Sequence, residues 1–348
     1  MQSDTTFSLT GTSKPNGGFN SHHSESRASN DRGARRHLEG DSDGAQADYL
    51  AAIEQDPENA TAHNNLGFLL AQMGKLDEAI SHYERALQID PHKSMAMVNM
   101  ALASVAKGND EDGVKWLRDA TAADSTNLLA WDNLARLLLK LSRLNEAEAA
   151  ARMAIELSPH EGRLHLTLGL ALAGQQRLAE AADILRHALQ LDPDSTNAWE
   201  QLGVVLFLRR DLGSAADALR RSLSLSPPNV TARYHLALVL LAKGEQEKAI
   251  GELQAILVLE PNYTPAQLDL AVLALSQGDW TSALSRLDSV LQIDPANSRA
   301  SFYRAVTLDQ LQRRNEASEI LRSLAERVSD KYAVRAREYL QQRDEVIH

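Results

Sequence analysis

The most informative part of the sequence is LGFLLAQMGKLDEAISHYERALQIDP, residues 66–91. It contains two runs of residues with apolar side chains at helical spacing, separated at Gly74 and ended by Pro91. Glycine permits the left-handed backbone that commonly ends a helix, and proline cannot continue one. The stretch therefore predicts two helices joined by a tight turn.

The same pattern recurs along most of the chain, and a proline marks each recurrence. These prolines are Pro57, Pro91, Pro159, Pro193, Pro227, Pro261 and Pro295. Neighbouring prolines are separated by 34 residues or by twice 34. Alignment on them gives eight consecutive units, which begin at Ala60, Ser94, Leu128, Gly162, Thr196, Val230, Thr264 and Ser298. A fixed period of this length is typical of proteins built from stacked helical hairpins.

Within each unit the first apolar stripe occupies the fourth, seventh and eleventh positions, as in Trp131, Leu134 and Leu138. The second stripe begins with a small residue such as Ala79 or Ala147, which lets two helices approach closely. This order of residues resembles the tetratricopeptide repeat family. The resemblance implies an all-α fold, a right-handed superhelix of eight 34-residue helical hairpins that binds partner segments in its concave groove.

The ends of the chain differ from the repeats in composition. Residues 1–44 are rich in Ser, Gly, Thr, Asn and Asp, which predicts a disordered tail. Residues 45–59 look like the second helix of a degenerate half repeat, followed by the eight repeats over 60–331. Residues 332–348 predict an amphipathic helix that caps the last repeat, since the ends of a solenoid need polar covers.

Composition excludes several classes of function. The net charge of -11 is spread along the chain and disfavours nucleic-acid partners, and the absence of cysteine excludes disulfides and zinc–thiolate sites. No apolar stretch approaches the roughly 18 to 20 residues that span a membrane, and no secretion signal is visible, so we expect a cytoplasmic protein. No phosphate loop, HExxH or GxSxG motif occurs, which predicts a non-enzyme without cofactor or metal. His63 and His165 fall where Trp131 stands in another unit, so we expect them to pack between helices.

The first helices carry apolar residues on a second face. Seven of the eight ninth positions are apolar: Phe68, Leu102, Leu170, Val204, Leu238, Val272 and Val306, with Arg136 as the exception. Fifth and twelfth positions such as Tyr234 and Phe207 extend this face. Such a surface predicts a groove for an apolar partner segment, although packing between adjacent first helices would explain it as well.

The sixth positions of the first three repeats are Asn65, Asn99 and Asn133. This alignment resembles the asparagine ladder in the repeat region of O-linked N-acetylglucosamine transferases, which implies hydrogen bonds from these amides to a partner's backbone. Arg136 and Lys140 lie one turn apart beside the ladder and could receive a carboxylate, or could be a solvated basic spot.

The sequence therefore predicts a non-catalytic scaffold that binds a protein or peptide. The residues expected to line its groove are Asn65, Phe68, Asn99, Leu102, Asn133, Arg136, Lys140, Leu170, Val204, Phe207, Tyr234 and Leu238. Two alternatives stay open at this stage. The apolar face could join copies of the chain into a self-assembled structure, or the protein could be an accessory factor of a glycosyltransferase.

Overall fold

A computed structural model of the protein describes residues 21–327 and 330–347, and every regular element within those ranges is an α-helix. The chain divides into two compact units, Met1–Pro193 and Asp194–His348. The all-α helical-repeat fold expected from the sequence is confirmed.

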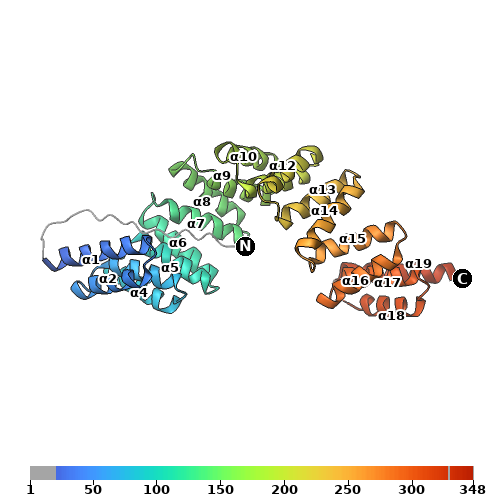
Figure 1. Ribbon diagram of the computed structural model, residues 1–348, viewed down its shortest axis with the longest axis horizontal. Coiled ribbons are helices and arrows are strands. Elements are labelled where there is room, and N and C mark those ends of the chain that lie inside the picture. Colours follow the sequence, from blue (N-terminus) through green and yellow to red (C-terminus); the bar gives the residue numbers. More distant parts are fainter. Residues whose placement is uncertain (1–20, 328–329, 348) are drawn as a thin grey trace. The chain divides into compact units, whose positions relative to one another are not determined.

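The first unit is a stack of five antiparallel helical hairpins (Figure 1). Its helices are α1 (Ser21–Leu38), α2 (Ser42–Gln55), α3 (Ala60–Gln72), α4 (Leu76–Ile89), α5 (Ser94–Ala106), α6 (Asp110–Ala123), α7 (Leu128–Lys140), α8 (Leu144–Leu157), α9 (Gly162–Gly174) and α10 (Leu178–Leu191). From α3 onward, the first helix of each hairpin begins at the residue that opens a repeat in the sequence.

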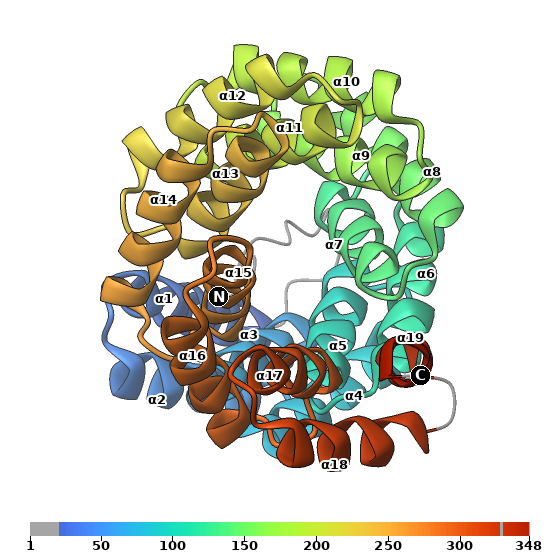
Figure 2. The same cartoon turned by 90° about the vertical axis from the view of Figure 1, so that its right-hand side faces the viewer.

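The second unit has four further hairpins and one terminal helix. Its helices are α11 (Thr196–Leu208), α12 (Leu212–Leu225), α13 (Val230–Ala242), α14 (Gln246–Leu259), α15 (Thr264–Ser276), α16 (Trp280–Ile293), α17 (Ser298–Gln310), α18 (Arg314–Ala325) and α19 (Lys331–Ile347). Within each unit the odd-numbered first helices from α3 to α17 lie on the inner side of the curve, and their second helices lie on the outer side (Figure 2).

The turn inside each hairpin requires one residue with positive φ. Gly74 supplies it in the α3–α4 hairpin with a φ of 78°. Four hairpins use a residue with a side chain instead: Ser142, Gln176, Arg210 and Gln312, with φ between 58° and 65°. These four residues follow the first helices at the place that Gly74 takes in its repeat, and their backbone is left-handed as the end of a helix requires.

Small residues let the two helices of a hairpin touch. A Cβ atom added to Gly67 would lie 2.7 Å from the ring of Tyr83 and 3.0 Å from the carbonyl oxygen of Ala79. The Tyr83 side chain is fully buried against this glycine. The close approach therefore depends on the absence of a side chain at Gly67.

The prediction of a disordered tail over residues 1–44 is wrong for residues 21–44. Helix α1 and the start of α2 occupy that segment, so residues 45–59 belong to a complete hairpin rather than to a half repeat without a partner. Gly33 packs on Tyr49 as Gly67 does on Tyr83, and Gly40 has a φ of 84° like the other turn glycines. Residues 1–20 of the expected tail lie outside the described residues.

Helix α1 lacks the apolar stripe because hydrogen bonds replace it. The Ser26 hydroxyl donates to the carbonyl of Ala52 at 2.6 Å, and the Ser29 hydroxyl donates to the Gln55 side chain at 3.0 Å. Both serines are buried. The hydrophobic pattern could not reveal a helix whose packed face is polar, and this first hairpin gives the stack a polar end, as solenoids need.

The last helix, α19, packs against α17 and α18, as expected for a capping helix. Phe302 of α17 lies between the rings of Tyr332 and Tyr339, with ring centroids 5.8 Å and 6.3 Å away. The Tyr339 hydroxyl also donates to Asp309 at 2.9 Å. An aromatic cluster thus closes the end of the second unit.

Candidate partner-binding surface

The residues predicted to line one groove are divided between the two units. Eight of them lie on α3, α5, α7 and α9 of the first unit: Asn65, Phe68, Asn99, Leu102, Asn133, Arg136, Lys140 and Leu170. The other four lie on α11 and α13 of the second unit: Val204, Phe207, Tyr234 and Leu238. They therefore form two separate candidate surfaces.

The amides of Asn65 and Asn99 are buried and bonded within the protein. Asn65 donates to Asn30 at 3.0 Å, Asn64 donates to Asn65 at 3.2 Å, and Asn99 donates to Asn64 at 2.9 Å. Asn65 and Asn99 are 2% and 0% exposed. These four side chains, which we call the amide relay, join α1, α3 and α5 instead of facing a partner.

The relay ends at Asn99. Its side-chain carbonyl oxygen is buried and has no hydrogen-bond partner among the described residues. Val98 occupies the position that Asn64 has one repeat earlier, and its side chain has no group to donate. Asn133 bonds instead to the carbonyl of Leu129 in its own helix, at 2.8 Å. The structure therefore does not support the expectation that these asparagines are free to hold a partner's backbone.

Polar contacts between residues 35 apart also join first helices in the second unit. The Tyr234 hydroxyl donates to Asp269 at 2.8 Å, and His235 lies 3.7 Å from Glu200. Burial, followed by the negative charge of Asp269, raises the pKa of Tyr234. Tyr234 thus serves the packing of α13 on α15, which is the packing alternative that the sequence left open.

The predicted basic spot is also engaged within the chain. Lys140 forms an ion pair of 2.8 Å with Asp110 of α6. Near Arg136, the buried carboxylate of Asp132 pairs with Arg163. Burial raises the pKa of Asp132, while the charge of Arg163 opposes that shift. A partner carboxylate at Lys140 would therefore have to displace the chain's own Asp110.

The apolar residues differ between the units. Phe68 and Leu102 are buried, at 3% and 9% exposure, and the Phe68 ring lies against His37 with centroids 5.3 Å apart. In the second unit, by contrast, all eight ninth and twelfth positions of four successive first helices are half-buried, and only Asp309 among them is polar. We call the seven apolar residues the apolar stripe: Val204, Phe207, Leu238, Leu241, Val272, Leu275 and Val306.

His63 and His165 are buried in hairpins, where the sequence placed them. The Nε2 atoms of both residues lie within hydrogen-bond distance of the carbonyl six residues earlier, at 3.3 Å from Pro57 and 2.8 Å from Pro159. Trp131, Arg233 and Gln267 donate to the equivalent carbonyls. Several residue types at the fourth position of a repeat can therefore form a hydrogen bond to the backbone carbonyl of the preceding turn.

Sequence reasoning missed the partners of the amide relay, Asn30 and Asn64, and the acids Glu200 and Asp269. A signal was present, since polar residues at the fifth position of one repeat meet polar residues at the sixth position of the next. Within the described ranges, no group of three or more potential metal ligands comes together. None of the described helices combines the length and apolar character needed to cross a membrane.

Comparison with family models agrees with this geometry. The model of the cilia and flagella-associated protein 70 C-terminal domain, a tetratricopeptide repeat model, matches residues 5–233, which is more than half of the chain. The tetratricopeptide repeat domain of cytochrome c-type biogenesis protein H matches residues 172–301, and a general tetratricopeptide repeat model matches 274–338. No curated protein sequence matches the chain.

Solved structures share the fold at low sequence identity. A tetratricopeptide repeat protein from Parabacteroides merdae is 18% identical with a TM-score of 0.53, covering 70% of this chain and 96% of that one. PilF of Pseudomonas aeruginosa is 21% identical with a TM-score of 0.52, covering 59% and 93%.

The Cut9–Hcn1 hetero-tetramer of the APC/C is 18% identical with a TM-score of 0.57, covering 77% of this chain but only 52% of that chain. Repeats, turns, hairpin packing and family models lead to one conclusion. The chain belongs to the tetratricopeptide repeat family, the one that includes the C-terminal domain of cilia and flagella-associated protein 70.

Proposed function

We propose that this protein is a non-catalytic interaction scaffold that binds a peptide or helix of a partner protein on the apolar stripe of its second unit. Tetratricopeptide repeat proteins generally mediate protein–protein interactions. The observation that carries the proposal is the partial exposure of all seven stripe residues, which belong to α11, α13, α15 and α17. These four helices lie on the inner side of the second unit (Figure 2). Contiguous apolar surface of this kind commonly marks an interaction site.

The first unit provides an internal comparison. There the ninth positions of α3 and α5 are covered, and Arg136 interrupts the row on α7. Leu170 alone is half-buried among the apolar ninth positions from α3 to α9. The twelfth positions of these helices are half-buried as in the second unit, so the two units differ at the ninth positions. We place the surface in the second unit for that reason, with Val204, Phe207 and Leu238 retained from the sequence prediction.

The partner segment should be apolar. The stripe offers aliphatic side chains and one phenylalanine, whereas the nearby Tyr234 and Asp269 already bond to each other. Affinity would then come chiefly from burial of apolar surface, at about 25 cal/mol per Å² before the costs of association. A peptide or an amphipathic helix with Leu, Ile or Val at regular spacing meets this requirement.

A capture experiment with the full chain tests the proposal. The double variant Leu238→Glu with Val272→Glu places two charges on the stripe, and Val258→Glu is the matched control because Val258 is 82% exposed on α14, outside the stripe. We expect one partner to be held by the native chain and the control but lost from the double variant, with unchanged helical circular dichroism. Equal capture by all three would contradict the proposal.

Self-assembly is the other outcome of this test. The native chain would then hold only copies of itself, and light scattering would show that the double variant no longer self-associates. In that case the stripe joins subunits instead of recruiting a partner.

The accessory role beside a glycosyltransferase rested on the asparagine alignment. Because the Asn65 and Asn99 amides are bonded inside the fold, we do not propose that role.

A further inference from the structure

One half-buried arginine of the second unit forms no ion pair with a described residue. Five of its arginines are half-buried. Four of these form ion pairs with carboxylates: Arg233 with Glu252, Arg299 with Asp269, Arg304 with Asp288 and Arg343 with Asp309. Arg286 of α16 forms no ion pair with any described residue and donates only to the neutral side chain of Gln267, at 3.0 Å.

The equivalent pair two helices earlier shows what Arg286 lacks. Arg233 and Glu252 lie 19 residues apart, across the α13–α14 hairpin, with their nitrogen and oxygen 2.6 Å apart. Gln267 and Arg286 face each other across the α15–α16 hairpin with the same separation in sequence. In the α15–α16 hairpin the arginine lies on the second helix instead of the first, and the residue that faces it is a glutamine instead of a glutamate. A partly desolvated charge that forms no direct ion pair favours binding of an anion.

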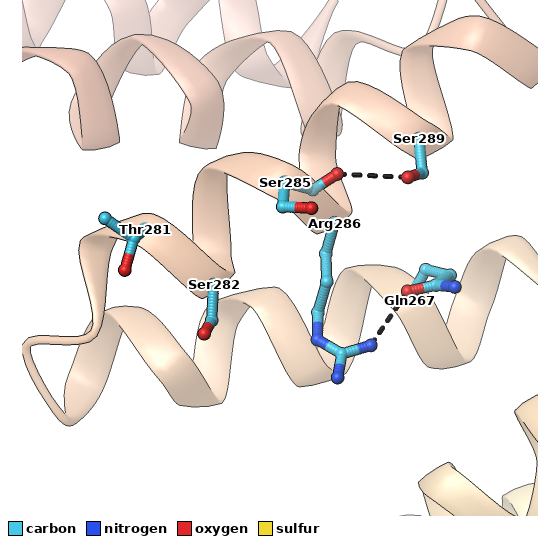
Figure 3. Close-up of a pocket in the computed structure, with 6 residues that line it drawn as sticks. All are labelled: Gln267, Thr281, Ser282, Ser285, Arg286 and Ser289. Atoms are coloured by element: carbon cyan, nitrogen blue, oxygen red, sulfur yellow. Dashed lines mark hydrogen bonds between the residues drawn. The ribbon is translucent and has the colours of Figure 1, made fainter.

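The space beside Arg286 can receive one. A hollow of about 470 Å³ is lined by polar side chains only: Gln267, Thr281, Ser282, Ser285, Arg286 and Ser289. Figure 3 shows the Arg286 side chain extending from α16 toward Gln267 on α15, with the serines along the same helix. This volume lies within the usual range of small-ligand sites, and the polar lining suits a hydrophilic ligand.

The hydroxyl groups that line the hollow differ in whether they already form a hydrogen bond within the protein. Thr281 donates to Asp279 at 3.0 Å, and Ser289 donates to the carbonyl of Ser285 at 3.0 Å. Hydrogen bonds from the hydroxyl and amide of Ser282 lower the pKa of Asp279, and the positive charge of Arg286 contributes in the same direction, so this carboxylate is ionised at neutral pH. It would repel an anion from the start of α16. The Ser285 hydroxyl has no partner among the described residues, which leaves the Arg286 and Ser285 end of the hollow open to an anion.

We propose that the hollow between α15 and α16 binds a phosphate-type oxyanion, with Arg286 as the cation and Ser285 as a further donor. A guanidinium presents paired N–H groups to two oxygens of an anion, and a hydroxyl on another side fits a third oxygen. A carboxylate has only two oxygens and would use this arrangement less well. The anion is either free phosphate or a phosphoryl group on a partner. This site lies apart from the apolar stripe and does not depend on the proposed function.

Calorimetric titration of the full chain with inorganic phosphate tests the site. We expect saturable binding by the native protein and a loss of affinity of at least about tenfold in Arg286→Gln. Gln267→Glu should cause a similar loss while raising the thermal midpoint, because it supplies the internal carboxylate that Arg233 has. Arg220→Gln is the control, since Arg220 lies on α12 and pairs with Asp217, and it should bind phosphate like the native chain.

Two further titrations identify the ligand class and its source. Acetate that binds as tightly as phosphate would overturn the phosphate-type assignment. N-acetyl-phosphoserine amide distinguishes the two sources, with N-acetylserine amide as the control that should not bind. Tighter binding than phosphate would assign the site to a phosphorylated partner. Equal or weaker binding would assign it to the free ion. Phosphate binding that is absent, or equal in the native protein, Arg286→Gln and Gln267→Glu, would refute the site.

Discussion

Single residues in this protein act mostly through the neighbour one repeat away. Asn64 shows this, since its amide donates to Asn65 of the same helix and accepts from Asn99 of the next hairpin. All three side chains are buried, so each lost bond would leave a polar group without water to replace it. The amide relay is therefore a structural element whose removal should be measurable.

We expect Asn64→Ala to destabilise the first unit by about 1–3 kcal/mol, because it leaves buried amide groups of Asn65 and Asn99 without partners. The thermal midpoint of the full chain checks this. Asn262→Ala is the control, since Asn262 is exposed in the α14–α15 turn and its side chain makes no hydrogen bond among the described residues. A midpoint unchanged in both variants would argue against the relay as a stabilising contact.

A second residue-scale effect depends on pH. The Nδ1 atoms of His63 and His82 lie 3.1 Å apart, and burial lowers the pKa of both imidazoles. Arg85 lowers the pKa of His63 further, while Glu78 and the Pro57 carbonyl oppose the shifts of His82 and His63, respectively. The unfolded chain therefore binds protons more readily near pH 6.5 than the folded chain does.

Stability contributed by this pair should be present above about pH 6.5 and be lost as the pH falls below it. Denaturation at pH 7.5 and at pH 5.5 measures the loss. His63→Gln should reduce the difference between the two conditions, because Gln267 shows that glutamine can donate to the same type of turn carbonyl without titrating. If the variant loses as much stability on acidification as the native chain, other groups cause the effect.

At the scale of the element, the hairpin depends on small residues at the helix crossing. Gly67 and Gly251 both lie inside helices, but only Gly67 has a neighbour within reach of an added Cβ atom. Alanine substitution at each of the two positions therefore separates the cost of overpacking from the intrinsic preference of helices for alanine.

We expect Gly67→Ala to destabilise the protein by about 1–3 kcal/mol, because Tyr83 and the α4 backbone would have to move. Gly251→Ala should instead stabilise it by about 0.5–1 kcal/mol, since nothing lies within 4 Å and alanine restricts the unfolded chain. Thermal midpoints of the two variants test the contrast. Shifts of the same sign would mean that helix preference, and not the crossing, governs these positions.

Helix α1 is the element that sequence reasoning did not find. Its removal, by deleting residues 1–40, should uncover the buried side chains of Ala45 and Tyr49. We expect lower amide protection in α2 and α3 and a lower thermal midpoint than in the full chain. Unchanged protection in α2 would show that α1 is dispensable for the cap.

At the scale of the whole molecule, contacts are local along the chain. Within each unit, each helix meets the next one, and first helices two apart also meet, as α3 meets α5 and α15 meets α17. Stability in such a stack is approximately a sum of hairpin terms and nearest-neighbour terms.

The effect of Gly67→Ala should therefore stay local. Native-state hydrogen exchange should show faster exchange in α3, α4 and α5 and unchanged exchange in α15, α16 and α17. Arg299→Gln, which removes the ion pair of Asp269, is the reciprocal control in the second unit and should affect α15 and α17. Faster exchange throughout the chain in either variant would show that the two units unfold together.

The hairpins, their 34-residue period and the turn at Gly74 could be predicted from the sequence, because periodic apolar residues, Gly and Pro act through the local backbone. It also placed His63 and His165 in hairpin packing. It failed at α1, whose packed face is polar. Three properties follow from the packed helices alone. Asn65 and Asn99 bond to neighbouring repeats, Phe68 is covered while Leu238 is half-buried, and Arg286 forms no ion pair with a described residue. These properties depend on which side chain of the next repeat lies opposite, and residues some 19 or 35 apart meet only after the helices have packed.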